Sequence, residues 1–503
     1  MPDPASLSVR PPAAPEVDEP TGAGGPAGVA VGRRLAFNAA AGGVANLCKI
    51  GIQLVMLPLM AHLLGPDEFG LFALALPTVA FFTSLADGGL GTALAREPQQ
   101  TGVVWSTAFR LLLAVGLLLA LLVAAWGMVL GSLAHDARVS GLMGLMALSL
   151  PLITLAVLPS ARLTRQGRLA VLAGSDFAAS LIGAAIAVLL ALKGFGAWSL
   201  SAQYVTAFAV RAVILNVAAF VPPGRGFDFA TLRPHLATGS SLISGRLAEF
   251  AGRMVENLLV GGAFGGALLG SYAFANQASR FMCEAASGPT WGALYTVALH
   301  SDQRRSANVH RLLLTVLAIG LAPLAALVAA TAPVLVPLVL GAKWAAAAPL
   351  IQVILPALVV TVMAWQCAAP LLALGESWLP LWFAVAMAVL RIVAVGAGAL
   401  VSPLVMVGGL ALAQVVVSTA LMAVTRVRLG PGFDPPFGSL WAPVLAAVLA
   451  GLAAHGLLPM AEATVPALLL ALSGGAVVYL LALALLDGRR LLAAGRQARG
   501  LLR

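Results

Sequence analysis

Charged residues are scarce in this chain, and their scarcity excludes most soluble folds. Asp, Glu, Lys and Arg make up 10% of the 503 residues, whereas hydrophobic residues make up 60%. A soluble globular domain carries roughly 25% charged residues, and a soluble fold with so few would expose large apolar patches and aggregate. Lipid is therefore the expected solvent for most of the chain.

Cysteine and histidine are also rare, with three and six copies. Cys48, Cys283 and Cys367 lie inside apolar segments, without the spacing of a disulfide framework or a metal site, so we expect packing roles and no cofactor. His310 is expected to lie in a solvated loop. The net charge of +10 comes mostly from short loops beside apolar segments, which indicates topology signals rather than nucleic-acid binding.

Long apolar stretches are what the chain has in abundance. A bilayer core of about 30 Å needs about 20 apolar residues as helix. Fourteen stretches qualify, near 35–63, 70–94, 103–131, 139–160, 170–192, 196–220, 236–262, 268–298, 309–331, 346–373, 378–399, 403–424, 438–457 and 464–486. The expected fold is an all-α polytopic membrane protein with about fourteen transmembrane helices.

Basic residues fix the expected orientation of these spans. With a cytoplasmic N-terminus, the inside segments hold 19 Lys and Arg residues, and the outside segments hold only Arg138, Lys193 and Lys343. This bias predicts that both termini are cytoplasmic. Residues 1–32 are rich in Pro, Ala and Gly and are expected to form a disordered cytoplasmic tail, and residues 487–503 a basic cytoplasmic tail.

An internal repeat divides the chain at an offset of 200 residues. The stretch 65–75 (GPDEFGLFALA) matches 265–275 (GGALLGSYAFA), and Asn46, Lys49 and Gln53 align with Arg246, Glu249 and Arg253. Six spans separate the copies, which makes the repeat parallel, about an axis along the membrane normal. We expect an N-lobe over 33–222, a C-lobe over 223–430, and two helices outside the repeat over 431–486.

Twelve ionisable residues lie within the expected spans. Each costs about 3 kcal/mol against lipid, so they are expected to face one another or a hydrated cavity. They are Lys49, Asp87, Arg110, Asp176, Arg211, Arg246, Glu249, Arg253, Glu256, Arg280, Glu284 and Arg391. At 100° per residue, Arg246, Glu249, Arg253 and Glu256 share one face of the seventh span. Polar residues of the first and eighth spans form similar stripes, and the stripes of the first and seventh are expected to meet in a central cavity.

Two interpretations of this polar face stay open. The spacings Arg246–Glu249, Glu249–Arg253 and Arg253–Glu256 suit ion pairs within one helix, without any ligand. Lys49, Arg211 and Arg391 have no acid within one turn, however, and seven cations against five anions favour an anionic ligand. We expect the ligand to contact Lys49, Arg211, Arg246, Arg253 and Arg280. Asn46, Gln53, Asn276 and Gln277 would line the cavity, and Asp87, Glu249, Glu256 and Glu284 would balance charge or couple an ion.

Three short motifs and the span count resemble those of the polysaccharide transporter family. The motifs are 64–72 (LGPDEFGLF), 87–93 (DGGLGTA) and 341–344 (GAKW), and the resemblance covers roughly residues 33–430. Members of this family are bacterial flippases of undecaprenyl-pyrophosphate-linked oligosaccharides. They belong to the multidrug, oligosaccharidyl-lipid and polysaccharide exporter superfamily.

The resemblance implies two six-helix lobes around a cationic cavity, alternating access, and a multi-pass protein of the plasma (inner) membrane. It also implies a lipid-linked oligosaccharide substrate for exopolysaccharide or O-antigen export, membrane lipid as surroundings, and a polysaccharide polymerase and glycosyltransferases as partners. A lipid II flippase and a cation or drug antiporter of the same superfamily remain alternatives. A membrane-embedded glycan polymerase is a weaker one, because no expected outside loop exceeds about fifteen residues, so we expect a transporter rather than an enzyme.

Overall fold

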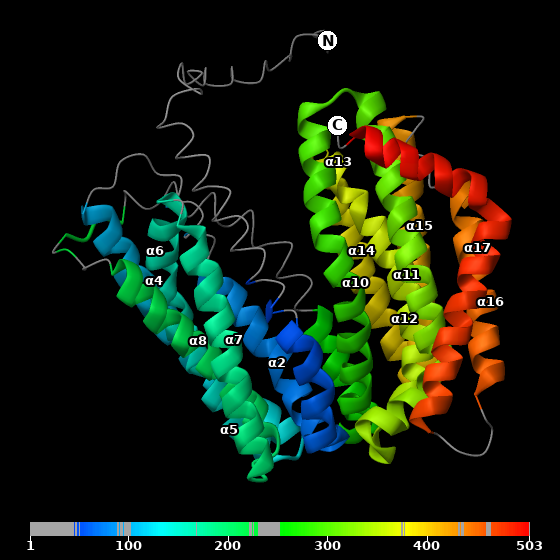
Figure 1. The fold of residues 1–503 in the computed structure, drawn as a ribbon. Coiled ribbons are helices and arrows are strands. Elements are labelled where there is room, and N and C mark those ends of the chain that lie inside the picture. The colour runs from blue at the N-terminus through cyan, green and yellow to red at the C-terminus, as the bar shows by residue number, and fades with distance from the viewer. Residues whose placement is uncertain are drawn as a thin grey trace, which may run out of the picture.

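A computed structural model shows a bundle of long helices (Figure 1). The structure describes residues 51–87, 102–166, 168–220, 252–373, 378–430, 437–458 and 464–501, together with isolated residues between these ranges (45, 48, 49, 90, 94, 224, 226–229, 376 and 433). Within these residues, ten helices are long and apolar enough to cross a membrane. The expected class, an all-α polytopic membrane protein, is confirmed.

Each of the fourteen expected spans overlaps a described helix. The first group comprises the helix Gly51–Leu64, α2 (Pro66–Asp87), α4 (Gly102–Leu133), α5 (Ala137–Ala147), α6 (Ser149–Arg165), α7 (Leu169–Leu192) and α8 (Ala197–Ala219). The fourth span consists of α5 and α6 together, which are separated only by Leu148. We refer to this group as the N-lobe.

The second group is the C-lobe, which begins with a helix over residues 252–264. It continues with α10 (Gly266–His300), α11 (Gln303–Leu340), the 3-10 turn η1 (Ala342–Trp344), α12 (Ala347–Gln366), α13 (Ala368–Ala373), α14 (Trp378–Ala399) and α15 (Pro403–Leu429). Outside it, α16 (Phe437–Leu457) and α17 (Val465–Leu501) pack on each other and on α11. The helix α17 bends at Asp487, where the backbone leaves helical geometry.

The two ends of the molecule differ in charge. Consecutive helices alternate in direction, so the turns fall at two ends. One carries Arg165, Arg168, Arg304, Arg305, Arg426 and Arg428, and we name it the basic end. The other, the far end, carries Arg138, Lys193 and Lys343. The two lobes lean apart toward the basic end and come together at the far end (Figure 1).

The lobes touch most closely where α2 crosses α10, near the start of both helices. A Cβ atom on Gly70 would overlap the carbonyl oxygen of Gly266, and a Cβ atom on Gly270 would overlap that of Pro66. The two contacts are equivalent under the 200-residue offset, because Gly70 corresponds to Gly270 and Pro66 corresponds to Gly266. Small residues at a helix crossing let the backbones approach closely, and here they place the two copies of the repeat against each other about a pseudo-two-fold axis.

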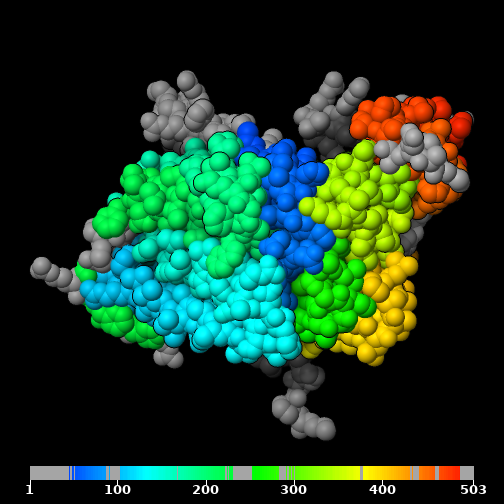
Figure 2. Space-filling model, turned by 90° about the horizontal axis from the view of Figure 1, so that it is seen from below, coloured from blue at the N-terminus to red at the C-terminus, as the bar shows by residue number. Residues whose placement is uncertain are grey.

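An aromatic cluster reinforces this crossing. Trp344 of η1 is fully buried, and its ring centroid lies 5.6 Å from that of Phe69 and 5.0 Å from that of Phe274. The Trp344 indole Nε1 donates a hydrogen bond to the carbonyl oxygen of Ala61, at 2.8 Å. Seen from the far end, the blue N-lobe helices lie directly against the green start of α10 (Figure 2). These contacts hold the lobes together at the far end.

One expectation about a histidine was wrong. His310 does not lie in a solvated loop; it is 1% exposed within α11 and packs on Phe433. Its Nε2 lies 3.8 Å from the sulfur of Cys367, at the break between α12 and α13. The helix α11 begins at Gln303, two turns before the span expected from hydropathy, because its first turns are polar but still packed against α15 and the loop that follows.

Candidate functional site

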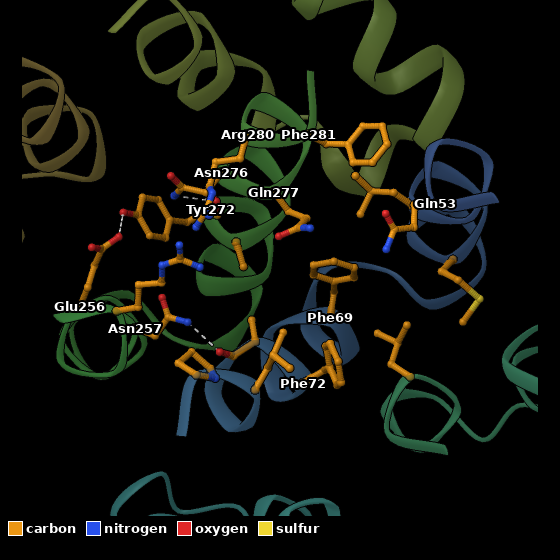
Figure 3. Close-up of a pocket in the computed structure, with 18 of the residues that line it drawn as sticks. Gln53, Phe69, Phe72, Glu256, Asn257, Tyr272, Asn276, Gln277, Arg280 and Phe281 are labelled. Carbon is orange, nitrogen blue, oxygen red and sulfur yellow. Dashed lines mark hydrogen bonds between the residues drawn. The ribbon is translucent and has the colours of Figure 1, made fainter. Parts of the chain in front are cut away.

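A cavity of about 280 Å³ lies between the two lobes (Figure 3). Its N-lobe wall comes from the helix Gly51–Leu64, α2 and α8, through Gln53, Met56, Leu57, Met60, Phe69, Phe72, Ala73, Leu76, Pro77, Leu200 and Gln203. Its C-lobe wall comes from the helix over 252–264, α10 and α14, through Arg253, Glu256, Asn257, Tyr272, Ala273, Asn276, Gln277, Arg280, Phe281 and Arg391. Phe69 belongs both to this lining and to the aromatic cluster around Trp344. That cluster therefore closes the cavity on the side of the far end.

The sequence-based candidates fall into three groups in the structure. Those that line the cavity are Gln53, Arg253, Glu256, Asn276, Gln277 and Arg280. Asn46, Arg246 and Glu249 lie outside the described residues, as do the side chains of Asp87 and Glu284, of which only the helix backbone is described. Lys49 and Arg211 are described but are absent from the lining of the cavity.

Lys49 and Arg211 lie nearer the basic end than the residues of their spans that line the cavity. Lys49 is partly buried and precedes Gln53 by one helical turn. Arg211 follows Leu200 by eleven residues, about three turns or 16 Å along α8, and so points in nearly the same direction. Its Nε lies 2.8 Å from Oδ1 of Asp176 on α7. Arg211 has no acidic neighbour within one turn of its own helix, α8. Its acidic partner comes from the adjacent helix, α7.

Glu256 is the most deeply placed charge of the cavity wall, at 2% exposure. Arg391 of α14 holds its carboxylate with two hydrogen bonds, Nε to Oε2 at 3.0 Å and Nη2 to Oε1 at 3.1 Å. The hydroxyl of Tyr272 on α10 donates a third. Residues on three helices therefore satisfy one buried carboxylate. Arg391 thus has its acid on a different helix, and spacing along the sequence could not reveal the pair.

Two amide side chains of the C-lobe wall donate hydrogen bonds to backbone carbonyl oxygens. Asn276 donates from Nδ2 to the carbonyl oxygen of Tyr272 at 3.2 Å. Asn257 donates from Nδ2 to the carbonyl oxygen of Ala73 at 2.7 Å, and this bond crosses from the C-lobe to α2 of the N-lobe. Sequence reasoning missed Asn257, Tyr272 and Gln203. Tyr272 could have been found, because it is the aromatic residue that aligns with Phe72 in the repeat.

The charge of the described lining is positive. Arg253, Arg280 and Arg391 contribute three cations and Glu256 one anion, which leaves a formal charge of +2. Guanidinium groups match the geometry of phosphate and carboxylate oxygens. Among the described residues, no group of three or more His, Cys, Asp and Glu side chains could hold a metal ion. The site therefore has the chemistry of a polar pocket for an anion-bearing ligand.

A smaller cluster of charges lies at the far end of the N-lobe. Arg138 binds Glu68 and Asp136, with shortest nitrogen–oxygen distances of 2.8 Å to each. The other oxygen of Glu68 accepts a hydrogen bond from the backbone N–H of Ala197, at 2.7 Å, at the start of α8. The Arg138 side-chain hydrogen bond holds the pKa of Asp136 below its usual value, and burial partly opposes this. The cluster ties together the starts of α2, α5 and α8.

The helical fold is shared with transporters of known structure. A lipid II flippase, MurJ, in an inward closed conformation matches 90% of this chain and 99% of its own, with a TM-score of 0.74 and 11% identity. An inward-facing multidrug resistance MATE family transporter of the MOP superfamily matches 76% of this chain and 94% of its own, with a TM-score of 0.63 and 15% identity. At these identities the similarity shows the fold alone.

Sequence comparison specifies the family within that fold. The model of a family described as polysaccharide biosynthesis protein matches residues 59–349. The chain belongs to this family, which confirms the resemblance carried by its motifs. The succinoglycan biosynthesis transport protein ExoT of Rhizobium meliloti (strain 1021) is 27% identical over 304 residues, which are 60% of this chain. That alignment spans 61% of the length of ExoT.

Proposed function

We propose that this protein is a flippase that carries undecaprenyl-pyrophosphate-linked oligosaccharides across the plasma membrane for export of a polysaccharide. The observation that carries the proposal is the net-cationic cavity between the lobes of a polysaccharide biosynthesis family member. Arg253 and Arg280 line the cavity, and a diphosphate is a ligand that guanidinium groups bind through charge-assisted hydrogen bonds. The amides of Gln53, Asn276 and Gln277 offer donors and acceptors to sugar hydroxyls.

The closed far end supports a mechanism of alternating access. In this conformation the α2–α10 crossing and the cluster around Trp344 block passage at the far end, while the lobes lean apart toward the basic end. The positive-inside rule places the basic end in the cytoplasm. A substrate assembled there would occupy the cavity, and rocking of the lobes would separate the crossing and release it on the other side, with the polyprenyl chain left in lipid.

Glu256 has a defined place in this proposal. Its carboxylate is engaged by Arg391 and Tyr272, so it balances the Arg391 charge. Arg253 and Arg280 are the other cations of the described lining and would contact the diphosphate. Glycosyltransferases would provide the substrate and a polymerase would consume the flipped product, whether exopolysaccharide or O-antigen.

A flipping assay in proteoliposomes tests the proposal. The substrate is a fluorescent undecaprenyl-diphosphate oligosaccharide, and the readout is protection of the dye from an external quencher. We expect Arg253→Ala and Arg280→Ala to lower the rate about tenfold or more, since each removes a charge-assisted contact. Arg304→Ala, an exposed arginine at the basic end, is the matched control and should flip at the wild-type rate. Full activity of both cavity variants at normal protein levels would overturn the cationic-cavity proposal.

The same vesicles separate the rival substrates. Lipid II and a lipophilic drug cation are offered in place of the oligosaccharide lipid. The +2 described lining disfavours the cation, which should move no faster than in empty vesicles. Lipid II also carries a diphosphate and should move more slowly than the oligosaccharide lipid. Faster movement of either one than of the oligosaccharide lipid would assign the protein to that substrate instead.

A further inference from the structure

The two walls of the cavity are copies of each other in position but not in chemistry. Seven positions of the N-lobe wall have an equivalent exactly 200 residues later in the C-lobe wall, and both members of each pair line the same cavity. On the first and seventh spans the pairs are Gln53 and Arg253, Met56 and Glu256, and Leu57 and Asn257. In every one of these pairs the C-lobe member is charged or more polar than its N-lobe counterpart.

The second and eighth spans repeat this contrast. Leu76 and Pro77 of α2 face the cavity at the positions where α10 presents Asn276 and Gln277, and Phe72 stands where α10 presents Tyr272. All four charged residues of the described lining belong to the C-lobe, whereas the only polar residues of the N-lobe wall are Gln53 and Gln203. A pseudo-symmetric cavity therefore has one ionic wall and one largely apolar wall.

Such a cavity can hold an asymmetric ligand in only one orientation. An anion is stabilised near the C-lobe wall and finds no cation on the described N-lobe wall. The aromatic and aliphatic surface of Phe72 and Leu76 suits the C–H face of a sugar ring, while Gln53 and Gln203 can bond hydroxyl groups at its edge. The ionic network of Glu256, Arg391 and Tyr272 joins the three helices that form the C-lobe wall.

We propose that the two lobes divide the ligand between them: the C-lobe wall binds the diphosphate through Arg253 and Arg280, and the N-lobe wall contacts the adjoining sugar. This deepens the proposed function and rests on it. The lobes move relative to each other during alternating access, so the diphosphate moves together with the C-lobe. The N-lobe wall closes over the sugar only when a glycan is attached to the diphosphate. The N-lobe wall thereby becomes the determinant of substrate specificity.

The repeat supplies a decisive test, because the positive charge of Arg253 can be moved to the equivalent N-lobe position, across the pseudo-two-fold axis. Arg253→Gln places the N-lobe residue in the C-lobe, and Gln53→Arg does the reverse. The double variant Gln53→Arg/Arg253→Gln keeps the composition and net charge of the cavity. Binding is measured in nanodiscs for two probes: undecaprenyl diphosphate, and undecaprenyl diphosphate that bears one hexose.

We expect Arg253→Gln and the double variant to lose about tenfold or more in affinity for both probes, whereas Arg253→Lys retains most of it. Phe72→Ala should weaken binding of the hexose-bearing probe more than binding of the bare diphosphate. Recovery of wild-type affinity in the double variant would overturn the inference, because net charge alone would then suffice. Equal losses for both probes in Phe72→Ala would also overturn it.

Two controls keep these outcomes separate from other failures. Size-exclusion profiles and melting temperatures show whether each variant is folded, and a destabilised Phe72→Ala is replaced by Phe72→Leu, which keeps the volume and removes the ring. Failure of the wild-type protein to bind either diphosphate probe contradicts the proposed function itself. Binding by the wild type together with rescue in the double variant contradicts only the division between the lobes.

Discussion

At the residue scale, Glu256 shows how a charge is kept at membrane depth. A carboxylate that is 2% exposed is tolerable only because Arg391 and Tyr272 satisfy it, and removing one partner of a buried pair costs about 3–5 kcal/mol. We expect Glu256→Gln to lower the melting temperature strongly, because it leaves the Arg391 guanidinium without its counter-charge. Thermal unfolding in detergent measures this.

The Asp176–Arg211 pair is the matched comparison. Its side chains are 38% and 33% exposed, so Asp176→Asn should cost about 1 kcal/mol or less. The double variant Glu256→Gln/Arg391→Gln removes both buried charges and should recover part of the stability lost in the single variant. A Glu256→Gln protein as stable as the wild type would mean that this ion pair does not hold the three helices together.

Asp136 gives a pH dependence at the far end. The Arg138 hydrogen bond holds the Asp136 pKa below its usual value, so this contact stabilises the folded loop above the unfolded-state pKa of about 3.9. That contribution is lost as the pH falls through the lower folded-state pKa. Protection factors for hydrogen exchange of residues 133–138, which remove the intrinsic pH dependence of the exchange rate, should therefore be unchanged between pH 7 and 5 and should fall only below about pH 4. Asp136→Asn should have low protection factors at every pH; a loss of protection already at pH 6 would contradict the assignment.

At the scale of elements, the α2–α10 crossing is the contact that must separate for the far end to open. A methyl group at Gly270 would overlap the Pro66 carbonyl, whereas one at Gly266 meets nothing within 4 Å. Overpacking of this kind costs about 1–3 kcal/mol, and only the conformation closed at the far end bears it. We expect Gly270→Ala to shift the protein toward the open far end.

Spin labels on the exposed residues Lys193 and Leu400 report that shift. They lie at far-end turns of the N-lobe and the C-lobe. Pulsed dipolar spectroscopy should show longer distances for Gly270→Ala than for the wild type, and the wild-type distribution for the control Gly266→Ala in the same helix. Identical distributions for all three would mean that the crossing does not govern the far end.

The helices and the local motifs could be predicted from the sequence. The length of an apolar stretch and the spacing of its glycines are properties of one segment and do not depend on how the segments pack together. Each of the fourteen expected spans overlaps a described helix, and ten described helices are long and apolar enough to cross a membrane. The match between 65–75 and 265–275 identified the two segments that cross, but not the crossing itself. The first and seventh spans do share a cavity, through Gln53 and Arg253, but the closest approach of the repeats occurs between α2 and α10. The partners of Glu256 and Arg211 could not be predicted, because they come from other helices and depend on how the lobes pack.

At the scale of the whole molecule, the shared architecture of the two lobes and the differences between their cavity walls have separate roles in the proposed function. The repeat gives two lobes that meet at a crossing near the far end, and divergence within the repeat gives a cavity whose walls differ. The extra pair α16 and α17 packs on α11 of the C-lobe, so it extends the side on which the described charges of the cavity lie. The expected limits of the lobes, 33–222 and 223–430, stay predictions, since both junctions lie partly outside the described residues.

The central claim is that the cavity between the lobes is where an oligosaccharide lipid is held by its diphosphate. The most direct measurement is electron cryomicroscopy of the protein in nanodiscs with undecaprenyl-diphosphate oligosaccharide bound. The account predicts diphosphate density within hydrogen-bonding distance of Arg253 and Arg280, and sugar density against Phe72 and Gln203. Diphosphate density elsewhere, with the cavity between the lobes empty, would contradict it.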